Sequence, residues 1–193
     1  MGRDDNLRQF ALAICGERKY NRYNTSHARC PSPVGTATGR KEEALSARNS
    51  AKALVLHNGK ILVNRCISKY GEYYALPGGG QHTGEMLGET VRRELLEETG
   101  YSVTPMRLSG IYERISEGRR DGNSHKIYFI FLCRLDSEER QQPTETDRFQ
   151  IGCEWIDLKD AHRRNLFPRA IRDNLSGLIG HGETIFIGSE KDR

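Results

Sequence analysis

Residues 79–101 read GGQHTGEMLGETVRRELLEETGY. Between residues 85 and 99, three apolar side chains recur every four positions and predict an α-helix with one buried stripe: Leu87, Val91 and Leu95. Thr83 is suited to cap the start of this helix, and Gly100 is suited to end it in the left-handed conformation. The segment Pro77-Gly78-Gly79-Gly80 breaks the chain just before the helix.

Three acidic residues share one side of the predicted helix, namely Glu94, Glu97 and Glu98. At 100° per residue they span an arc of about 100°, which overlaps the edge of the apolar stripe. Their mutual repulsion and the negative end of the helix dipole each oppose this arrangement by about 1 kcal/mol. A bound divalent cation resolves the conflict, and ligands that are all oxygens favour Mg²⁺ or Mn²⁺ over zinc.

A glutamate-rich helix is most often a solvated surface, and a Pro-Gly-Gly-Gly run alone is most often a turn. The spacing of the fixed positions argues against both simple interpretations. From Gly79 through Glu85, Arg93-Glu94-Leu95 and Glu97-Glu98 to Gly100, the stretch resembles the Nudix box, G-x5-E-x7-R-E-U-x-E-E-x-G-U, where U is a bulky aliphatic residue. The one departure is Tyr101, which stands where an aliphatic residue is usual.

The resemblance implies an α/β fold, a Nudix α/β/α sandwich around a mixed β-sheet. It also implies a pyrophosphohydrolase that uses a divalent metal and water to cleave a nucleoside diphosphate linked to a group X. The site residues that it implies are a carbonyl of Gly78 or its neighbour, Glu97 and Glu98 as metal ligands, Glu94 as ligand or base, Arg93 as the residue that orients a glutamate, and Gly79 and Glu85 as supporting residues.

Some members of the family recruit the general base from a later loop, and the candidates here are Glu145, Asp147 and Glu154. Two arginines are candidates for binding substrate. Arg65 could point into the cleft from the second strand, and Arg114 could grip phosphate together with Arg119 and Arg120. For these three later arginines a solvated loop is the stronger alternative.

Apolar runs elsewhere in the chain predict strands at residues 53–56, 61–67, 73–76, 106–115, 125–135 and 153–158, with an Asn58-Gly59 hairpin turn after the first. Residues 168–178 are expected to form a terminal helix that begins at a proline. Residues 1–49 lack apolar periodicity beyond a short helix at 6–15, and they are expected to be a disordered or loosely packed extension. The catalytic domain is therefore expected to span residues 50–193.

The charge distribution bears on the partners. Nine Lys/Arg and five Asp/Glu in residues 1–50 account for the whole net charge of +4, so the remainder is neutral and no stable nucleic-acid partner is expected. Five scattered cysteines without zinc spacing favour a reducing compartment, and no apolar stretch is long enough to cross a membrane. We expect a cytoplasmic protein that acts on a small nucleotide and, as in many members of the family, could form a homodimer.

The sequence leaves X open, since nucleoside triphosphates, ADP-ribose and nucleotide sugars all fit the box. A second hypothesis is a regulatory module with the same fold that binds a nucleotide or ADP-ribose without hydrolysing it. Such modules typically have eroded boxes, whereas this box is intact, so catalysis is favoured.

Overall fold

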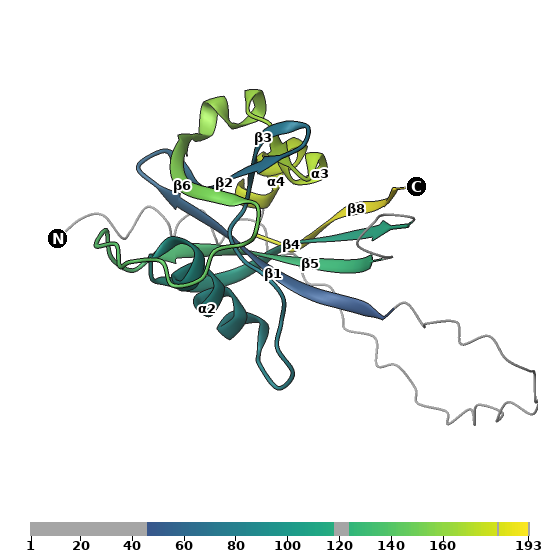
Figure 1. Cartoon of the computed structure of the whole chain (residues 1–193), viewed down its shortest axis with the longest axis horizontal. Coiled ribbons are helices and arrows are strands. Elements are labelled where there is room, and N and C mark those ends of the chain that lie inside the picture. The colour runs from purple at the N-terminus through teal and green to yellow at the C-terminus, as the bar shows by residue number, and fades with distance from the viewer. Residues whose placement is uncertain (1–45, 118–123, 181, 193) are drawn as a thin grey trace, which may run out of the picture. The chain divides into compact units, whose positions relative to one another are not determined.

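The structure is a computed structural model that describes residues 46–117, 124–180 and 182–192 (Figure 1). Most of the extension expected at residues 1–49 lies outside the described residues, as do the helix expected at 6–15 and both Arg119 and Arg120. The elements follow in this order: β1 (Ala47–His57), β2 (Lys60–Ser68), β3 (Gly71–Ala75), α2 (Leu87–Thr99), β4 (Val103–Ser116), β5 (Ser124–Leu135), β6 (Gln150–Asp157), the 3-10 helix η1 (Leu158–Arg163), β7 (Leu166–Phe167), α3 (Arg169–Asp173), α4 (Leu175–Gly180) and β8 (Ile185–Asp192).

The strands form a mixed sheet in the order β7-β3-β2-β1-β5-β4-β8, with β6 paired to the other edge of β2. Three pairs are parallel: β1 with β5, β4 with β8, and β3 with β7. The predicted hairpin between β1 and β2 is confirmed, because Asn58 and Gly59 both have positive φ angles and Leu56 lies opposite Ile61.

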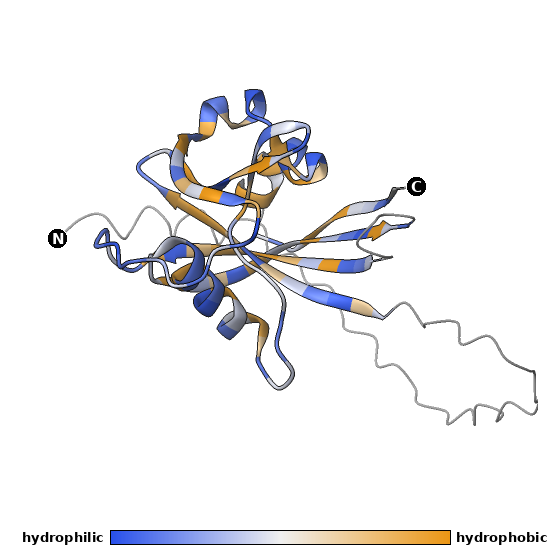
Figure 2. Cartoon of the chain, viewed as in Figure 1, coloured by the Kyte–Doolittle hydropathy of each residue, from blue (hydrophilic) through white to orange (hydrophobic). Residues whose placement is uncertain are grey.

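Two hydrophobic cores lie on opposite faces of the strands, because side chains alternate along each strand. On β1, Ala53 and Val55 pack toward α2, where Val91 and Leu95 meet them. Leu54 faces the other way, into a core closed by three residues of the late helices: Ile171, Leu175 and Leu178. Figure 1 shows α2 and the pair α3–α4 on opposite sides of the strands, and Figure 2 shows apolar residues along the strands that lie between them. The α/β/α sandwich is confirmed.

The structure differs from the sequence-based expectation at several element ends. Helix α2 begins at Leu87 with Met86 as its N-cap, so Thr83 does not cap it; instead the Glu89 carboxylate accepts a hydrogen bond from the Met86 amide. The single terminal helix expected at residues 168–178 is two short helices that meet at Asn174. Strand β1 begins at Ala47, ahead of the expected domain start at residue 50, and strands β7 and β8 were not predicted.

Within the part of the chain that the structure describes, no helix combines the length and the apolar character that a membrane crossing requires.

Candidate active site

The glycine loop before α2 is attached to the edge of β1 that faces away from β5. The Ala53 amide donates to the Pro77 carbonyl and the Ala51 amide donates to the Gly79 carbonyl, both at 2.9 Å. Gly78 has a φ of 123°, and a Cβ atom there would collide with the Ala51 carbonyl. A glycine is therefore required at this position both by the backbone conformation and by the close approach to β1.

Gly79 performs a second function, because it faces the carboxylate of Glu94 on α2. A Cβ atom built on Gly79 would occupy the space of that carboxylate. The glycine thus lets the acidic side chain lie directly against the loop backbone. This contact joins the first fixed position of the box to the first glutamate of its acidic run.

Arg93 holds three of the acidic side chains together. Its Nε and Nη2 atoms donate to the two oxygens of Glu85 at 2.7 and 3.0 Å, and Nη1 donates to Glu94 at 2.8 Å and to Glu97 at 3.1 Å. Nη2 also donates to the carbonyl of Gly80 at 3.0 Å. The hydrogen bonds from Arg93 lower the pKa of Glu85 to about 2, and the His82 amide and Thr90 hydroxyl add to this effect. A guanidinium fork can serve these acceptors at once because its donors lie in one plane.

Glu98 occupies a different environment, since only 7% of it is exposed. Its Oε2 atom accepts hydrogen bonds from the Gly78 amide at 2.7 Å and from the Asn64 side chain at 2.8 Å. Burial raises the pKa of Glu98, although Lys52 and the two hydrogen bonds oppose the increase. A carboxylate held in this way is costly to ionise unless a cation lies nearby.

The candidate metal ligands do not form a closed cluster. Among the described residues, no group of three or more His, Cys, Asp or Glu side chains is gathered around one point as metal ligands would be. Glu94 and Glu97 are instead bound to Arg93, and the Gly78 carbonyl accepts a hydrogen bond from the Lys52 ammonium. The available donors are all oxygens, so their chemistry fits Mg²⁺ or Mn²⁺.

The acidic loop that follows β5 is fastened to the C-terminal end of α2. Carbonyls at the end of a helix have no partners within the helix, and here this loop supplies the donors. The loop donates through Thr144 N to Glu97 O, Arg140 Nε to Thr99 O and Gln141 N to Gly100 O, and Gln150 Nε2 at the start of β6 donates to Glu98 O, all between 2.8 and 3.0 Å. The Glu145 amide adds a bond of 3.2 Å to Glu97 O. These bonds bring Glu145 and Asp147 to the wall of the cavity beside α2.

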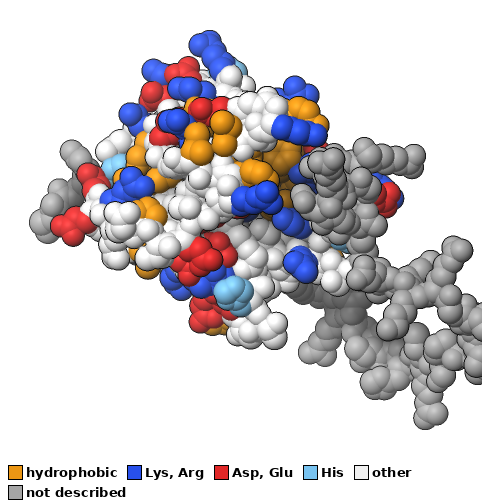
Figure 3. Space-filling view, in the orientation of Figure 1, with side chains coloured by type: hydrophobic (Ala, Val, Ile, Leu, Met, Phe, Trp, Pro, Cys, Tyr) orange, Lys and Arg blue, Asp and Glu red, His pale blue; other side chains and the backbone are white. Residues whose placement is uncertain are grey.

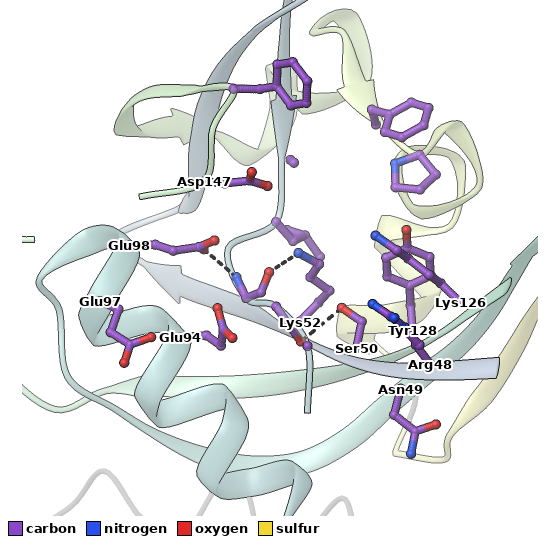
Figure 4. A pocket seen from close by; sticks show the side chains of 18 of the residues that line it. Arg48, Asn49, Ser50, Lys52, Glu94, Glu97, Glu98, Lys126, Tyr128 and Asp147 are labelled. Carbon is purple, nitrogen blue, oxygen red and sulfur yellow. Dashed lines mark hydrogen bonds between the residues drawn. The ribbon is translucent and has the colours of Figure 1, made fainter. Parts of the chain in front are cut away.

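A cavity of about 710 Å³ lies between these elements (Figure 4). Acidic residues of α2 and of the loop after β5 line one side of the cavity. Figure 4 shows Lys52 between the glutamates and the pair Arg48 and Lys126. The wall also includes the aromatic residues Tyr73, Tyr128, Phe149 and Phe167. Figure 3 shows a group of acidic side chains near the centre of the drawn face, with basic side chains beside it and further acidic and basic side chains spread over the same face.

The model of the NUDIX domain family matches residues 47–175, which include the whole loop, helix α2 and the cavity wall. The chain belongs to the Nudix family. An ADP-ribose pyrophosphatase of Methanocaldococcus jannaschii is 36% identical over 75 residues, which cover 39% of this chain and 43% of that protein. The nucleoside triphosphatase NudI of Enterobacter sp. is 32% identical over 85 residues, which cover 41% of this chain and 60% of that protein. The chain thus spans less than two thirds of the length of either relative.

Solved structures of Nudix proteins share the fold. A NUDIX hydrolase from Nitrosomonas europaea superimposes with a TM-score of 0.58 at 18% identity, covering 75% of this chain and 79% of that one. An ADP-ribose pyrophosphatase from Streptococcus suis gives 0.53 at 22% identity, covering 72% and 98%. At these identities the likeness concerns the fold, and the relatives are named for different substrates.

Two residues that were predicted to serve this Nudix site lie elsewhere. Arg65 does not line the cavity; it forms a 3.3 Å ion pair with Glu72 and is nearly half exposed. Because Asn64 points toward Glu98, strand alternation directs Arg65 to the opposite face of β2. Glu154 is also absent from the cavity wall, since it lies opposite Val63, which faces the core on the α3–α4 side.

The structure places Arg114 in the cavity wall, with its guanidinium 4.6 Å from the centre of the Phe167 ring. Sequence reasoning missed three further cations of the wall: Arg48, Lys52 and Lys126. A signal for the first two was present, because positions 48, 50 and 52 are polar and alternate with Ala51 and Ala53, as one face of a strand would.

Proposed function

We propose that this Nudix protein is a divalent-metal-dependent hydrolase that cleaves the diphosphate linkage between a nucleoside and a group X. The observation that carries the proposal is the contact of the glycine loop with the acidic face of α2. There, Gly79 accommodates the Glu94 carboxylate and the Gly78 amide binds Glu98. The contact lies in a cavity large enough for a nucleotide-sized ligand.

Glu94, Glu97 and Glu98 are the residues that would hold Mg²⁺ or Mn²⁺. The Gly78 carbonyl would join them once the Lys52 ammonium has moved from it. A bound metal ion of this kind neutralises phosphate charge and polarises the phosphorus centre. The raised pKa of Glu98 supports this assignment, because burial of a carboxylate next to a loop carbonyl is favourable when a cation is shared between them.

The remaining side chains orient the reacting groups. Arg93 binds Oε1 of Glu94, whereas within the described part of the chain Oε2 of Glu94 has no hydrogen-bond partner. We assign this oxygen to accept a proton from the attacking water, with Glu145 and Asp147 as the alternative bases at the cavity wall. The water oxygen bonds to one phosphorus, the bridging P–O bond breaks, and a nucleoside monophosphate and a phosphorylated X leave.

The test is hydrolysis of a panel of ADP-ribose, a nucleotide sugar, a dinucleoside polyphosphate and ATP, with MgCl₂ or MnCl₂. We expect Glu97→Gln to lower kcat by about 10²-fold or more. Glu89→Gln is the matched control, because Glu89 is an exposed acid of the same helix and glutamine can still cap the Met86 amide. Equal losses in both variants would contradict the assignment of the site.

A different outcome would favour the regulatory module without hydrolysis. In that case the wild-type protein would bind one nucleotide of the panel in calorimetry and cleave none of them. The intact box supports hydrolysis over this alternative.

A further inference from the structure

Three basic residues stand directly opposite one another on adjacent strands of the cavity wall. Arg48 of β1 is paired in register with Lys126 of β5, and Lys126 is paired with Arg114 of β4. Side chains of directly opposed residues project from the same face of a sheet, and all three line the cavity. Lys52 lies four positions after Arg48 on the same face of β1. We call these four residues the cation row.

Within the cation row, the opposed pair Arg48 and Lys126 is an unfavourable arrangement for the protein alone. Like charges directly opposite each other on neighbouring strands destabilise a sheet. Although the Lys126 side chain is exposed to the cavity, the protein around its ammonium group partly removes it from water and lowers its pKa, and Lys52 adds to the effect while Asp147 opposes it. On the next strand, β8, Glu190 lies opposite Arg114. The carboxylate of Glu190 accepts a hydrogen bond from the Tyr112 hydroxyl.

The row starts at the acidic side of the cavity and leads away from it. Lys52 contacts the Gly78 carbonyl beside Glu98, and Figure 4 shows Arg48 and Lys126 on the side away from the glutamates. Along β1, Arg48 lies about 13 Å from Lys52 at the usual rise per strand residue. A diphosphate bound beside the glutamates would be within reach of Lys52. Arg48 and Lys126 form no ion pair with any residue that the structure describes, so neutralising these two cations requires additional negative charge farther along the cavity.

We propose that X itself carries phosphate, so that the substrate is a nucleoside triphosphate or a longer polyphosphate rather than a diphosphate joined to an uncharged sugar. This inference rests on the proposed hydrolase function of the same site. With a nucleoside triphosphate, water adds to the α-phosphorus and the bond from that phosphorus to the oxygen bridging it to the β-phosphorus breaks. The products are a nucleoside monophosphate and inorganic pyrophosphate. The cation row binds the diphosphate portion that becomes the leaving group.

The first experiment measures binding without catalysis. Inorganic tripolyphosphate and pyrophosphate are titrated into the full chain by calorimetry in EDTA, with wild type, Lys126→Met and Arg48→Met. We expect wild type to bind tripolyphosphate about tenfold more tightly than pyrophosphate, and each variant to lose about tenfold of its tripolyphosphate affinity, as expected for one charge-assisted contact. Arg134→Met is the matched control, because Arg134 is an exposed cation of β5 that pairs with Asp136 outside the cavity.

The second experiment compares kcat/KM for ATP and ADP-ribose with MgCl₂. We expect a preference for ATP, and we expect Lys126→Met to lower kcat/KM for ATP about tenfold and for ADP-ribose by less than threefold. Equal losses on both substrates, or equal binding of tripolyphosphate and pyrophosphate by wild type, would overturn the inference. If no substrate is cleaved but tripolyphosphate binding still depends on Lys126 and Arg48, the proposed hydrolase function fails while the phosphate-binding role of the row stands.

Discussion

Replacement of Glu98 by glutamine separates the stability of the fold from its proposed metal binding. Glu98 is the most buried acid of the box, and burial raises the pKa of its carboxyl group. Glutamine keeps the shape and an acceptor oxygen for the Gly78 amide and the Asn64 side chain, while it removes the charge. The substitution therefore relieves an ionisation penalty without creating a cavity.

In EDTA at pH 7 we expect Glu98→Gln to raise the free energy of unfolding by about 1–2 kcal/mol. This is the usual cost of burying a polar group whose lost hydration is incompletely compensated. The sign follows from the raised pKa of Glu98 in the folded state. Its penalty is present at pH values above the folded pKa and vanishes below the ordinary carboxyl pKa of about 4.3, where both states are protonated. The advantage of the variant should accordingly disappear as the pH falls toward 4.

Addition of Mg²⁺ should reverse the order. A metal ion at one hundred times its dissociation constant stabilises wild type by about 2.7 kcal/mol, because it binds the folded state alone. Glu98→Gln lacks one proposed ligand and should gain much less. Urea unfolding followed by the fluorescence of Trp155, the single tryptophan, measures all four combinations of protein and metal.

Glu97→Gln is the control for this experiment. Its side chain is 29% exposed and is ion-paired with Arg93, so neutralising it should bring no stabilisation in EDTA. If Glu98→Gln is less stable than wild type in EDTA at pH 7, the buried charge of Glu98 carries no ionisation penalty in the folded protein. Equal stabilisation of wild type and Glu98→Gln by Mg²⁺ would refute the assignment of Glu98 as a ligand.

Three further predictions concern the contacts around Arg93 and Gly79. Gly79→Ala should lower kcat/KM at least tenfold while circular dichroism stays unchanged, because the added methyl group occupies the space of the Glu94 carboxylate; retained activity would count against this contact. Arg93→Lys should lower the free energy of unfolding by about 2 kcal/mol in urea titrations, since an ammonium group cannot replace the guanidinium fork; a change below about 0.5 kcal/mol would count against this reading. The pKa of Glu85 is lowered to about 2, so its ionised carboxylate stabilises the folded state fully above pH 4.5, and this contribution is lost as the pH falls through 2. The difference in free energy of unfolding between wild type and Arg93→Lys should therefore shrink as the pH is lowered, and a difference that grows in acid would contradict this.

The parts of the fold that the sequence predicts are those with strong local signals. The apolar stripe and Gly100 define α2 to within two residues at each end, and Asn58-Gly59 defines the hairpin. A left-handed C-cap is specified by one residue and a type I′ turn by two adjacent residues, so both can be predicted from the local sequence alone.

The parts that it does not predict depend on partners far along the chain. The residues that open β1 read as polar linker, and they form a strand because β5 pairs with them in parallel register. Strand β8 contains three apolar residues before Gly188 and exists through its parallel pairing with β4. Asn174 interrupts the expected terminal helix at a point where its side chain donates to the Ala170 carbonyl.

The candidate site shows the same division. The motif identifies the glutamates, Arg93 and the glycines, because these lie within one helix and one loop. Lys126 of the cation row belongs to β5 and reaches the cavity through sheet register, which a motif does not encode. Arg65 was misassigned for the complementary reason, since one step along β2 exchanges the two faces of the sheet.

The release of AMP from ATP or ADP-ribose by the wild-type protein, measured in MgCl₂ and in EDTA, tests the central claim most directly. If Glu94, Glu97 and Glu98 hold a divalent ion beside the glycine loop, AMP accumulates in MgCl₂ and its release stops in EDTA. Equal release of AMP in EDTA, or binding of these nucleotides with no AMP formed in MgCl₂, would contradict the claim.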